Sequence, residues 1–247
     1  MSDFRYQRPN NFPLIVKNLI IINALVWIAQ MTIGKQFNMS EHISLYPIMP
    51  KELLVAAQSS PSFAPYFGFA PYQIVTHMFA HSTGMLTHLL FNMFALWMFG
   101  RILENVWGPK RFLFFYLSCG VGAALFHLTI QYFRCEQLLH AIHVYGENDP
   151  QVTALVGALS PALGASGAVM GVMAAFAFLF PNTELFIMFI PVPVKAKWVV
   201  LGYVLIDLFG GLGVYTDNVA HFAHLGGAIT GFLMVLIWNK TNKKQFY

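Results

Sequence analysis

The sequence predicts an all-α membrane protein, a bundle of six membrane-spanning helices, and its composition carries the first part of this prediction. Of the 247 residues, 57% are hydrophobic and only 10% are charged, whereas a typical soluble domain is about 45–50% apolar and about 25% charged. The mean hydropathy is +0.60. A water-soluble globule could not cover itself with so few polar side chains. The composition therefore excludes a soluble enzyme, a disordered protein and a nucleic-acid-binding domain.

Six stretches of the chain are long and apolar enough to cross the hydrocarbon core, which takes roughly 20 mostly apolar residues. The first is interpreted as a retained helix and not as a cleaved signal peptide, because it follows a polar segment and lacks a convincing cleavage site. Residues 185–194 are apolar, but they are few and two prolines interrupt them, so we predict an interfacial loop there. The predicted spans are residues 14–33, 85–103, 112–133, 163–180, 198–215 and 219–238.

Basic residues set the predicted orientation of these spans. With the N-terminus in the cytoplasm, most Lys and Arg residues lie on the cytoplasmic side, and only Lys35, Lys51 and Arg134 lie outside. This asymmetry follows the positive-inside rule. Because the number of predicted spans is even, we expect both termini to be cytoplasmic.

Two connections on the predicted outer side are long. Residues 34–84 mix prolines with aromatic residues, so we expect a structured element that lies in the membrane interface. Residues 134–162 are rich in polar side chains and are expected to form a second outer loop. The chain shows no internal repeat, and its two cysteines are too few for a disulfide framework. Residues 1–247 are therefore predicted to form a single membrane domain.

Polar side chains within membrane spans are costly, so each one is a candidate functional residue. His88, Ser166 and His224 lie three to five residues into the second, fourth and sixth spans, which all enter from the outer side. At 1.5 Å per residue their depths agree at about 5–8 Å. Three polar groups at one level on one side indicate a common site. The other polar residues in the predicted spans include Asn92, His127, Asp207 and His221.

Ser166 lies between Gly164 and Gly167 at the expected start of the fourth span. Glycines on both sides let another backbone or a substrate approach closely. Free N–H groups at a helix N-terminus stabilise a developing negative charge, so a serine there combines a nucleophile with an anion-binding position. The alternative is that these small residues only form a packing face between helices.

His224 comes shortly before Gly227 and Gly231, a G-x-x-x-G pair that permits tight contact with a neighbouring helix. It lies on nearly the same helical face as Gly227. If the neighbour is the fourth span, the imidazole meets the Ser166 hydroxyl and can act as its general base. The alternative is a histidine that bonds to a carbonyl group of another helix. His221 is expected to lie closer to the outer surface and to have a lesser role.

His88 and Asn92 are four residues apart and share one face of the second span. Both side chains can donate hydrogen bonds while neutral. Such donors suit an oxyanion hole, where dipoles are arranged in advance around a developing charge. The alternative is a polar contact that only joins two helices.

These motifs, in this order, resemble those of the rhomboid family of intramembrane serine proteases. The matching segments are H-x-x-x-N at 88–92, G-A-S-G at 164–167 and A-H-x-x-G-x-x-x-G at 223–231. The resemblance implies a Ser166–His224 dyad with no obligatory acid, and an oxyanion site formed by the Ser166 backbone N–H, His88 and Asn92. It also implies that residues 34–84 form a half-embedded lateral loop, that residues 210–218 cap the active site, and that the fifth span is a possible lateral gate.

One position departs from the family pattern. Several relatives have an aromatic residue four positions after the nucleophile, where it stacks on the catalytic histidine. Here that position is Met170, whose thioether can still contact a ring. Asp217 is a candidate to orient His224, but its loop is expected to be exposed, so we favour a dyad. Asp207 is expected to bond to a neighbouring helix or to face a wet cavity.

Other functions fit the sequence less well. A metal site could use the pair His77 and His81 or the pair His221 and His224, but there is no H-E-x-x-H motif and no carboxylate adjoins either pair in the sequence. A non-enzymatic member of the same fold would lack the serine or the histidine. A transporter would need charged residues along its pathway, or repeat symmetry. We therefore expect no metal and no cofactor.

The sequence thus predicts a serine endopeptidase that cleaves transmembrane segments of other membrane proteins near the outer leaflet. Its expected partners are those transmembrane substrates and the lipid bilayer, and no nucleic acid is expected. The compact size and the lack of a targeting segment predict a bacterial inner membrane, with the active site facing the outer side. The sequence carries no signal for an oligomeric state.

Overall fold

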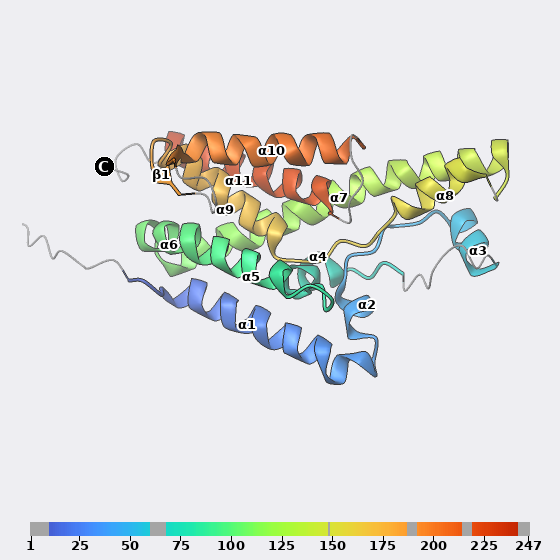
Figure 1. The fold of residues 1–247 in the computed structure, drawn as a ribbon, viewed down its shortest axis with the longest axis horizontal. Helices are drawn as coiled ribbons and strands as arrows, with labels where there is room; N and C mark the ends of the chain where they lie inside the picture. The colour runs from blue at the N-terminus through green and yellow to red at the C-terminus, as the bar shows by residue number, and fades with distance from the viewer. Residues whose placement is uncertain (1–9, 60–67, 148, 187–191, 214–218, 242–247) are drawn as a thin grey trace, which may run out of the picture.

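The computed structural model describes residues 10–59, 68–147, 149–186, 192–213 and 219–241, and most of them are helical (Figure 1). The longer helical segments are α1 (Leu14–Met31), α5 (Leu86–Ala95), η3 (Leu96–Gly100, a π-helical segment), α6 (Arg101–Trp107), α7 (Pro109–Tyr145), α9 (Ser166–Leu179), α10 (Ala196–Gly211) and α11 (His221–Thr241). The shorter elements are η1 (Ile33–Lys35), α2 (Met39–Ile43), α3 (Lys51–Ser59), α4 (Gln73–Thr76), η2 (His77–Phe79), α8 (Pro150–Gly157), β1 (Glu184–Leu185) and β2 (Val194–Lys195).

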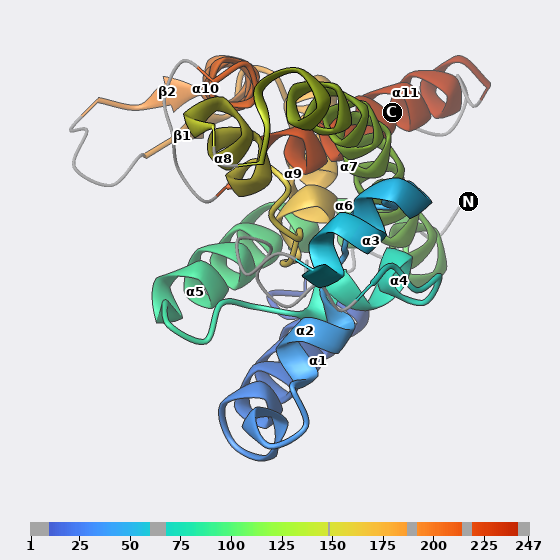
Figure 2. The ribbon, with the colours of Figure 1, turned by 90° about the vertical axis from the view of Figure 1, so that its right-hand side faces the viewer.

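The long helices run side by side along the long axis of the molecule (Figure 1). Helix α1 forms one edge, α10 forms the opposite edge, and α7, α9 and α11 lie between them. The start of α1 and the end of α11 lie at the same end of the bundle. The short helices α2, α3, α4 and α8 gather at the other end, which faces the viewer in Figure 2.

In the part of the chain that the structure describes, four helical stretches are long and apolar enough to cross a membrane. They coincide with four of the six predicted spans, although the third continues 12 residues beyond its predicted end, so the prediction of a helical membrane protein is confirmed. The segments α9 and α10 fall short, with 14 and 16 residues. The four stretches are Leu14–Met31, Leu86–Trp107, Pro109–Tyr145 and His221–Thr241.

The fourth predicted span begins later than the sequence suggests. Ahead of α9 the chain is irregular, and Ala162 exchanges backbone hydrogen bonds of 2.8 and 2.9 Å with Leu45. Both residues are buried, with exposures of 2% and 0%. Non-helical backbone is tolerated at membrane depth where protein covers it. The surrounding protein thus allows the helix to begin inside the bundle, at Ser166.

The prediction of an outer loop at residues 134–162 is wrong for most of that range. Helix α7 continues without a break to Tyr145, and α8 follows it. Cys135, Leu138 and Ala141 follow at helical spacing and are buried on one side of this part of α7, while most of the polar residues that suggested a loop are exposed. The apolar side forms a second small core with α3 and α8, made of Leu53, Cys135, Leu138, Ala141, Val152 and Leu159.

The predicted structured element at residues 34–84 contains several short helices, and a buried glutamine links its parts. The Gln73 amide nitrogen donates to the carbonyl oxygens of His42 (3.2 Å) and Gly68 (3.1 Å), and its amide oxygen accepts from the Tyr46 N–H. Residues 60–67 lie outside the described part of the chain. The predicted loop at 185–194 is closed at its base by antiparallel pairing of β1 with β2, and residues 187–191 are not among those described.

Glycines bring α9 and α11 into backbone contact. A Cβ atom on Gly227 would overlap the carbonyl oxygen of Gly167, and one on Gly231 would overlap that of Gly171. Larger residues at these positions would therefore hold the two helices apart. All ten residues of α9 from Gly167 to Phe176 are buried, so α9 forms the centre of the main core.

At the opposite end of the bundle from α2–α4, a buried carboxylate ties α6 to α1. The two oxygens of Glu104 accept hydrogen bonds from the backbone N–H groups of Ile15 (2.9 Å) and Val16 (2.8 Å). These N–H groups belong to the first turn of α1, where no intrahelical partner exists. Glu104 therefore has a structural role as a cap.

Candidate active site

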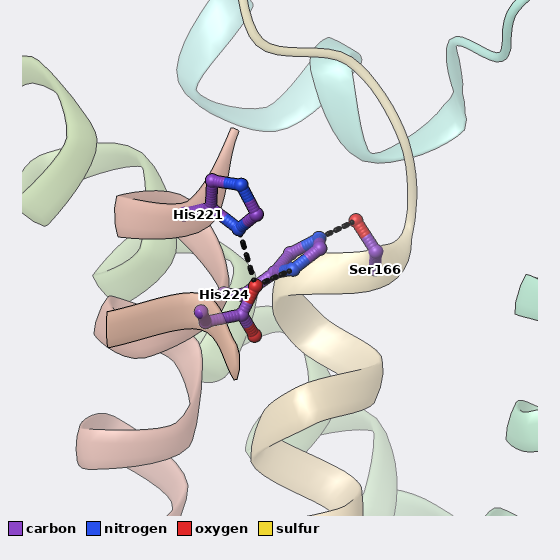
Figure 3. Close-up of polar contacts among 4 residues, drawn as sticks. Ser166, His221 and His224 are labelled. Carbon is purple, nitrogen blue, oxygen red and sulfur yellow. Dashed lines mark hydrogen bonds and ion pairs between the residues drawn. The ribbon is translucent and has the colours of Figure 1, made fainter. Parts of the chain in front are cut away.

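The side chains of Ser166 and His224 meet in the structure. Ser166 is the first residue of α9, and His224 lies on the first turn of α11. The His224 Nε2 atom lies 2.7 Å from the Ser166 Oγ atom (Figure 3). The serine O–H can donate to the nitrogen lone pair at this distance. A base in contact with a hydroxyl is the arrangement that activates a serine nucleophile.

A sharp turn before α9 sets the position of Ser166. Gly164 has φ +119°, a conformation that only glycine adopts readily. Its N–H donates to the carbonyl oxygen of His77 over 2.9 Å. The turn thereby places Ser166 on the first turn of a helix, where backbone N–H groups lack intrahelical partners and can bind an anion.

A carboxylate from α10 lies behind His224. The Oδ1 atom of Asp207 lies 2.9 Å from the Nδ1 atom of His224 and 2.9 Å from the Nδ1 atom of His221 (Figure 3). Asp207 is 4% exposed and His221 is 7% exposed. A carboxylate oxygen accepts hydrogen bonds, so each imidazole donates from Nδ1. For His224 this leaves the lone pair on Nε2, the atom that faces Ser166.

His88 lies against the turn that precedes the serine. Its Nδ1 atom accepts a hydrogen bond from the Ser82 N–H at 3.3 Å, so the ring proton is on Nε2. A Cβ atom on Gly164 would lie 2.9 Å from His88 Nε2 and 3.5 Å from Ser166 Oγ. The imidazole and the hydroxyl therefore flank the same glycine, and only a residue without a side chain fits between them.

Asn92 lies one helical turn further along than His88. Its amide nitrogen donates to the His88 carbonyl oxygen over 2.8 Å, which uses one of its two hydrogens. The side chain is buried, and its second hydrogen remains available to a ligand. The structure thus places His88 beside the serine and gives Asn92 a contact with its own helix.

The remaining predicted site residues form the packing beneath the serine. Met170 is buried in the main core at 5% exposure, so the suggestion that it contacts the His224 ring stays a prediction. Gly167, Gly227 and Gly231 form the contact between α9 and α11 described above.

Two further histidines that the sequence singled out bond to neighbours instead of to the site. His127 lies 3.4 Å from the Gln131 amide nitrogen. The Nε2 atom of His81 lies 2.8 Å from the Asn23 amide oxygen. Within the described part of the chain, no three His, Cys, Asp or Glu side chains are grouped so that they could hold a metal ion.

The contact between Asp207 and His224 is the feature of the site that the sequence did not reveal. The sequence shows no carboxylate next to the pair of histidines on the sixth span, but the structure brings one to them from α10. The available signal was that Asp207 is the only acidic residue within a predicted span. Asp217, the candidate considered for orienting His224, lies outside the described residues.

Comparisons with known proteins show the family of this chain. The family model described as "Rhomboid domain" matches residues 69–240. The chain is 31% identical over 172 residues to Rhomboid protein 1, mitochondrial, of Saccharomyces cerevisiae, covering 70% of this chain and 43% of the relative. It is 27% identical over 237 residues to RHOMBOID-like protein 12, mitochondrial, of Arabidopsis thaliana, covering 94% and 60%.

A bacterial relative is similar to the same degree. The chain is 30% identical over 174 residues to Rhomboid protease AarA of Providencia stuartii, covering 65% of this chain and 53% of the relative. Across these three relatives, the matched region spans between 43% and 60% of the relative's length.

Proposed function

Because this chain belongs to the rhomboid family, we propose that it is a serine endopeptidase that cleaves transmembrane segments of other membrane proteins through Ser166 and His224. The observation that carries this proposal is the 2.7 Å contact between His224 Nε2 and Ser166 Oγ. One relative, Rhomboid protease AarA, is itself named as a protease, which supports protease activity in the family.

The chemistry follows from the positions of the two side chains. His224 Nε2 takes the proton of the Ser166 hydroxyl as the oxygen attacks the scissile carbonyl carbon. The resulting imidazolium then gives this proton to the leaving amine, and an acyl-enzyme remains. Water, deprotonated by the same nitrogen, hydrolyses the acyl-enzyme and restores the hydroxyl.

The tetrahedral intermediate carries a negative oxygen that needs hydrogen-bond donors. The Ser166 backbone N–H at the start of α9 is one proposed donor, and the dipole of α9 adds a favourable potential there. His88 is the second, since its Nε2–H flanks Gly164 next to the serine. Asn92 is the third, through the amide hydrogen that its helix does not use.

The membrane arrangement is part of the proposal. Helices of 14 and 16 residues measure about 21 and 24 Å, so α9 and α10 can complete six crossings where neighbouring protein covers their ends. The start of α1 and the end of α11 lie at the same end of the bundle (Figure 1), which supports termini on one side of the membrane, and the positive-inside rule favours the cytoplasmic side. The site then lies toward the outer leaflet, where a transmembrane substrate segment would be cleaved.

Two further parts of the proposal concern regions around the site. Helix α10 exposes most of its apolar side chains, which supports a lateral gate at this edge of the bundle. The proposed cap at 210–218 lies largely outside the described residues. A bacterial inner membrane stays a prediction, because the relatives named above come from mitochondria and from a bacterium.

The test is to replace the proposed nucleophile. Ser166→Ala should abolish cleavage of a transmembrane reporter in proteoliposomes, and labelling by a fluorophosphonate probe should disappear with it. Ser160→Ala is the matched control, because Ser160 precedes the same helix but is exposed, and its hydroxyl donates to the Gly157 carbonyl oxygen, away from His224. This control should keep both activity and labelling.

Two outcomes would overturn the proposal. One is a folded Ser166→Ala protein that still cleaves the reporter. The other is loss of wild-type cleavage on addition of EDTA, since a serine mechanism needs no metal ion.

A further inference from the structure

We propose that Asp207 is a positioning residue for this hydrolysis, so that the site works as Asp207–His224–Ser166 and not as a dyad. The inference rests on the proposed function and adds a third group to it. It starts from the Asp207 Oδ1 atom, which lies 2.9 Å from the Nδ1 atom of His224 while Nε2 of the same ring lies 2.7 Å from Ser166 Oγ.

The first step concerns the position of the ring proton. A neutral imidazole carries one proton, on Nδ1 or on Nε2. Only the form protonated on Nδ1 has the Nε2 lone pair that can take the serine proton. A carboxylate at Nδ1 accepts this N–H and thereby selects the reactive tautomer. Without this carboxylate, both tautomers of His224 are populated, and the form protonated on Nε2 cannot accept the serine proton at that atom.

The second step concerns charge. When His224 takes the serine proton, the imidazole becomes a cation inside a half-buried site. The structure gives His224 one ion-pair partner among the described residues, and it is Asp207. Among the described residues, His88 and His127 also interact electrostatically with His224, and His221 shares the Asp207 oxygen with it; none of these three is an anion. Asp207 is therefore the group that can stabilise the transient imidazolium.

The third step separates the two histidines that share this oxygen. The His221 ring lies against α10 so closely that a Cβ atom on Gly210 would overlap it. Its Nδ1 atom donates to Asp207 Oδ1 over 2.9 Å. His221 therefore fixes the carboxylate and α10 in place, whereas His224 is the ring that also contacts the serine.

The main alternative is that Asp207 only joins α10 to α11. Glu104 shows what a purely structural buried carboxylate does in this molecule, since its oxygens accept from two backbone N–H groups and cap a helix. Asp207 instead accepts hydrogen bonds from two imidazoles, one of which contacts the nucleophile. Glu104→Gln is thus a matched control for the loss of a buried carboxylate without a change at the serine.

The main test is Asp207→Asn in the full-length protein reconstituted in liposomes. An asparagine can donate to Nδ1 of His224, which favours the wrong tautomer. We expect kcat to fall by roughly 10²–10⁴-fold with little change in KM, and the rate of fluorophosphonate labelling of Ser166 to fall in parallel. Glu104→Gln should lower thermal stability but leave kcat per folded molecule within about threefold.

Chemical rescue adds a measurement that a structural role would not affect. Formate added to Asp207→Ala should restore part of kcat, because a free carboxylate can occupy the vacated position at Nδ1. Chloride at the same ionic strength should not restore it.

A measurement on the unaltered protein covers the case in which these variants do not fold. Nitrogen-15 NMR of histidine-labelled wild type, with His224 assigned by comparison with His224→Gln, should show the proton on Nδ1. A proton on Nε2 would overturn the inference, and so would a folded Asp207→Asn with wild-type kcat. Cleavage that survives Ser166→Ala would instead overturn the proposed function, while the tautomer of His224 could still be read.

Discussion

Helices α9 and α10 both contribute to the site, but they are packed in opposite ways. In α9 ten of the 14 residues are buried, whereas in α10 only Ala196, Val200, Asp207 and Gly211 are. Most large side chains of α10 are exposed at the edge of the bundle, among them Trp198 at 57%. The nucleophile therefore comes from the centre of the core, and the carboxylate comes from a helix at the edge of the bundle, most of whose residues are not buried.

The space around individual glycines also differs between the helices of the core and α10. On α11, Gly227 permits backbone contact with α9 at Gly167, so a Cβ atom there would overlap protein. On α10, a Cβ atom on Gly202 would meet no atom within 4 Å, whereas one on Gly210, near the end of the helix, would overlap the His221 ring. The contact between α9 and α11 therefore leaves no room at Gly227, while α10 is closely packed near Asp207 and His221 and open around Gly202.

The largest effect should come from the histidine that joins these two regions. His224→Ala removes the base, so reporter cleavage should fall by about 10²–10⁴-fold or more. His221→Ala leaves the serine and its base in place and should retain activity within about tenfold. The two variants are compared by kcat per folded molecule in the same detergent. Equal loss in both would show that the site needs both imidazoles and that the base is not identified by its contact with Ser166.

The next effect concerns the proposed oxyanion donors on α5. Loss of one such donor typically costs about 10²–10³-fold in kcat, whereas an interhelical hydrogen bond in a membrane contributes only about 0.6 kcal/mol to stability. We expect the larger loss for His88→Ala, because His88 Nε2 flanks Gly164 beside the serine. Asn92→Ala should lose less, and the double variant should lose less than the product of the two. Full kcat per folded molecule in both single variants would remove these residues from the mechanism.

A pair of glycine substitutions tests the packing difference directly. In Gly227→Ala the new methyl group would overlap the Gly167 carbonyl oxygen, so α9 and α11 must separate, at a cost of at least about 1–3 kcal/mol. Gly202→Ala should be neutral or stabilising by up to about 1 kcal/mol, since alanine favours helix and nothing is near its methyl group. Thermal unfolding measures the stability of both variants, and reporter cleavage measures their activity. Equal destabilisation by the two substitutions would mean that α10 is packed as tightly as α11.

The smallest effect should be a pH dependence of stability in the segment that leads into α5, next to the turn before α9. Burial lowers the pKa of His77 from its ordinary value of 6.5 to about 4. Burial, together with nearby His88, lowers the pKa of His81 to about 3. Both are neutral when folded and gain protons on unfolding below pH 6.5. Their stabilising contribution is therefore complete above pH 6.5 and is lost as the pH falls toward 4 and 3.

Thermal unfolding of Ser166→Ala protein, in which self-cleavage cannot interfere, should thus show a lower Tm at pH 5 than at pH 7.5. Adding His81→Gln should narrow this difference, because glutamine can still donate near the Asn23 amide oxygen but does not titrate. An unchanged difference would assign the acid sensitivity to other groups.

Local sequence was enough to predict most of the long helices, because an apolar stretch of about 20 residues is typical of a helix that crosses a membrane. It was also enough to select Ser166 and His224, whose neighbouring glycines are visible in the chain. It failed for residues 134–162, where polar side chains on the outer faces of α7 gave the composition of a loop. It could not pair Asp207 with His224, because that contact depends on how α10 packs against α11, a relation between segments that no local pattern encodes.

Helix α7 has 37 residues, about 55 Å at 1.5 Å per residue, whereas the hydrocarbon layer is only about 30 Å thick. Its far end packs against α3 and α8, and these three segments together project beyond the other helices (Figure 1). If the chain cleaves transmembrane substrates as proposed, a bulky domain directly outside the cleaved segment would have to fit beside this projecting part. The length of the linker between that domain and the membrane would then matter, in addition to the sequence at the cleavage site.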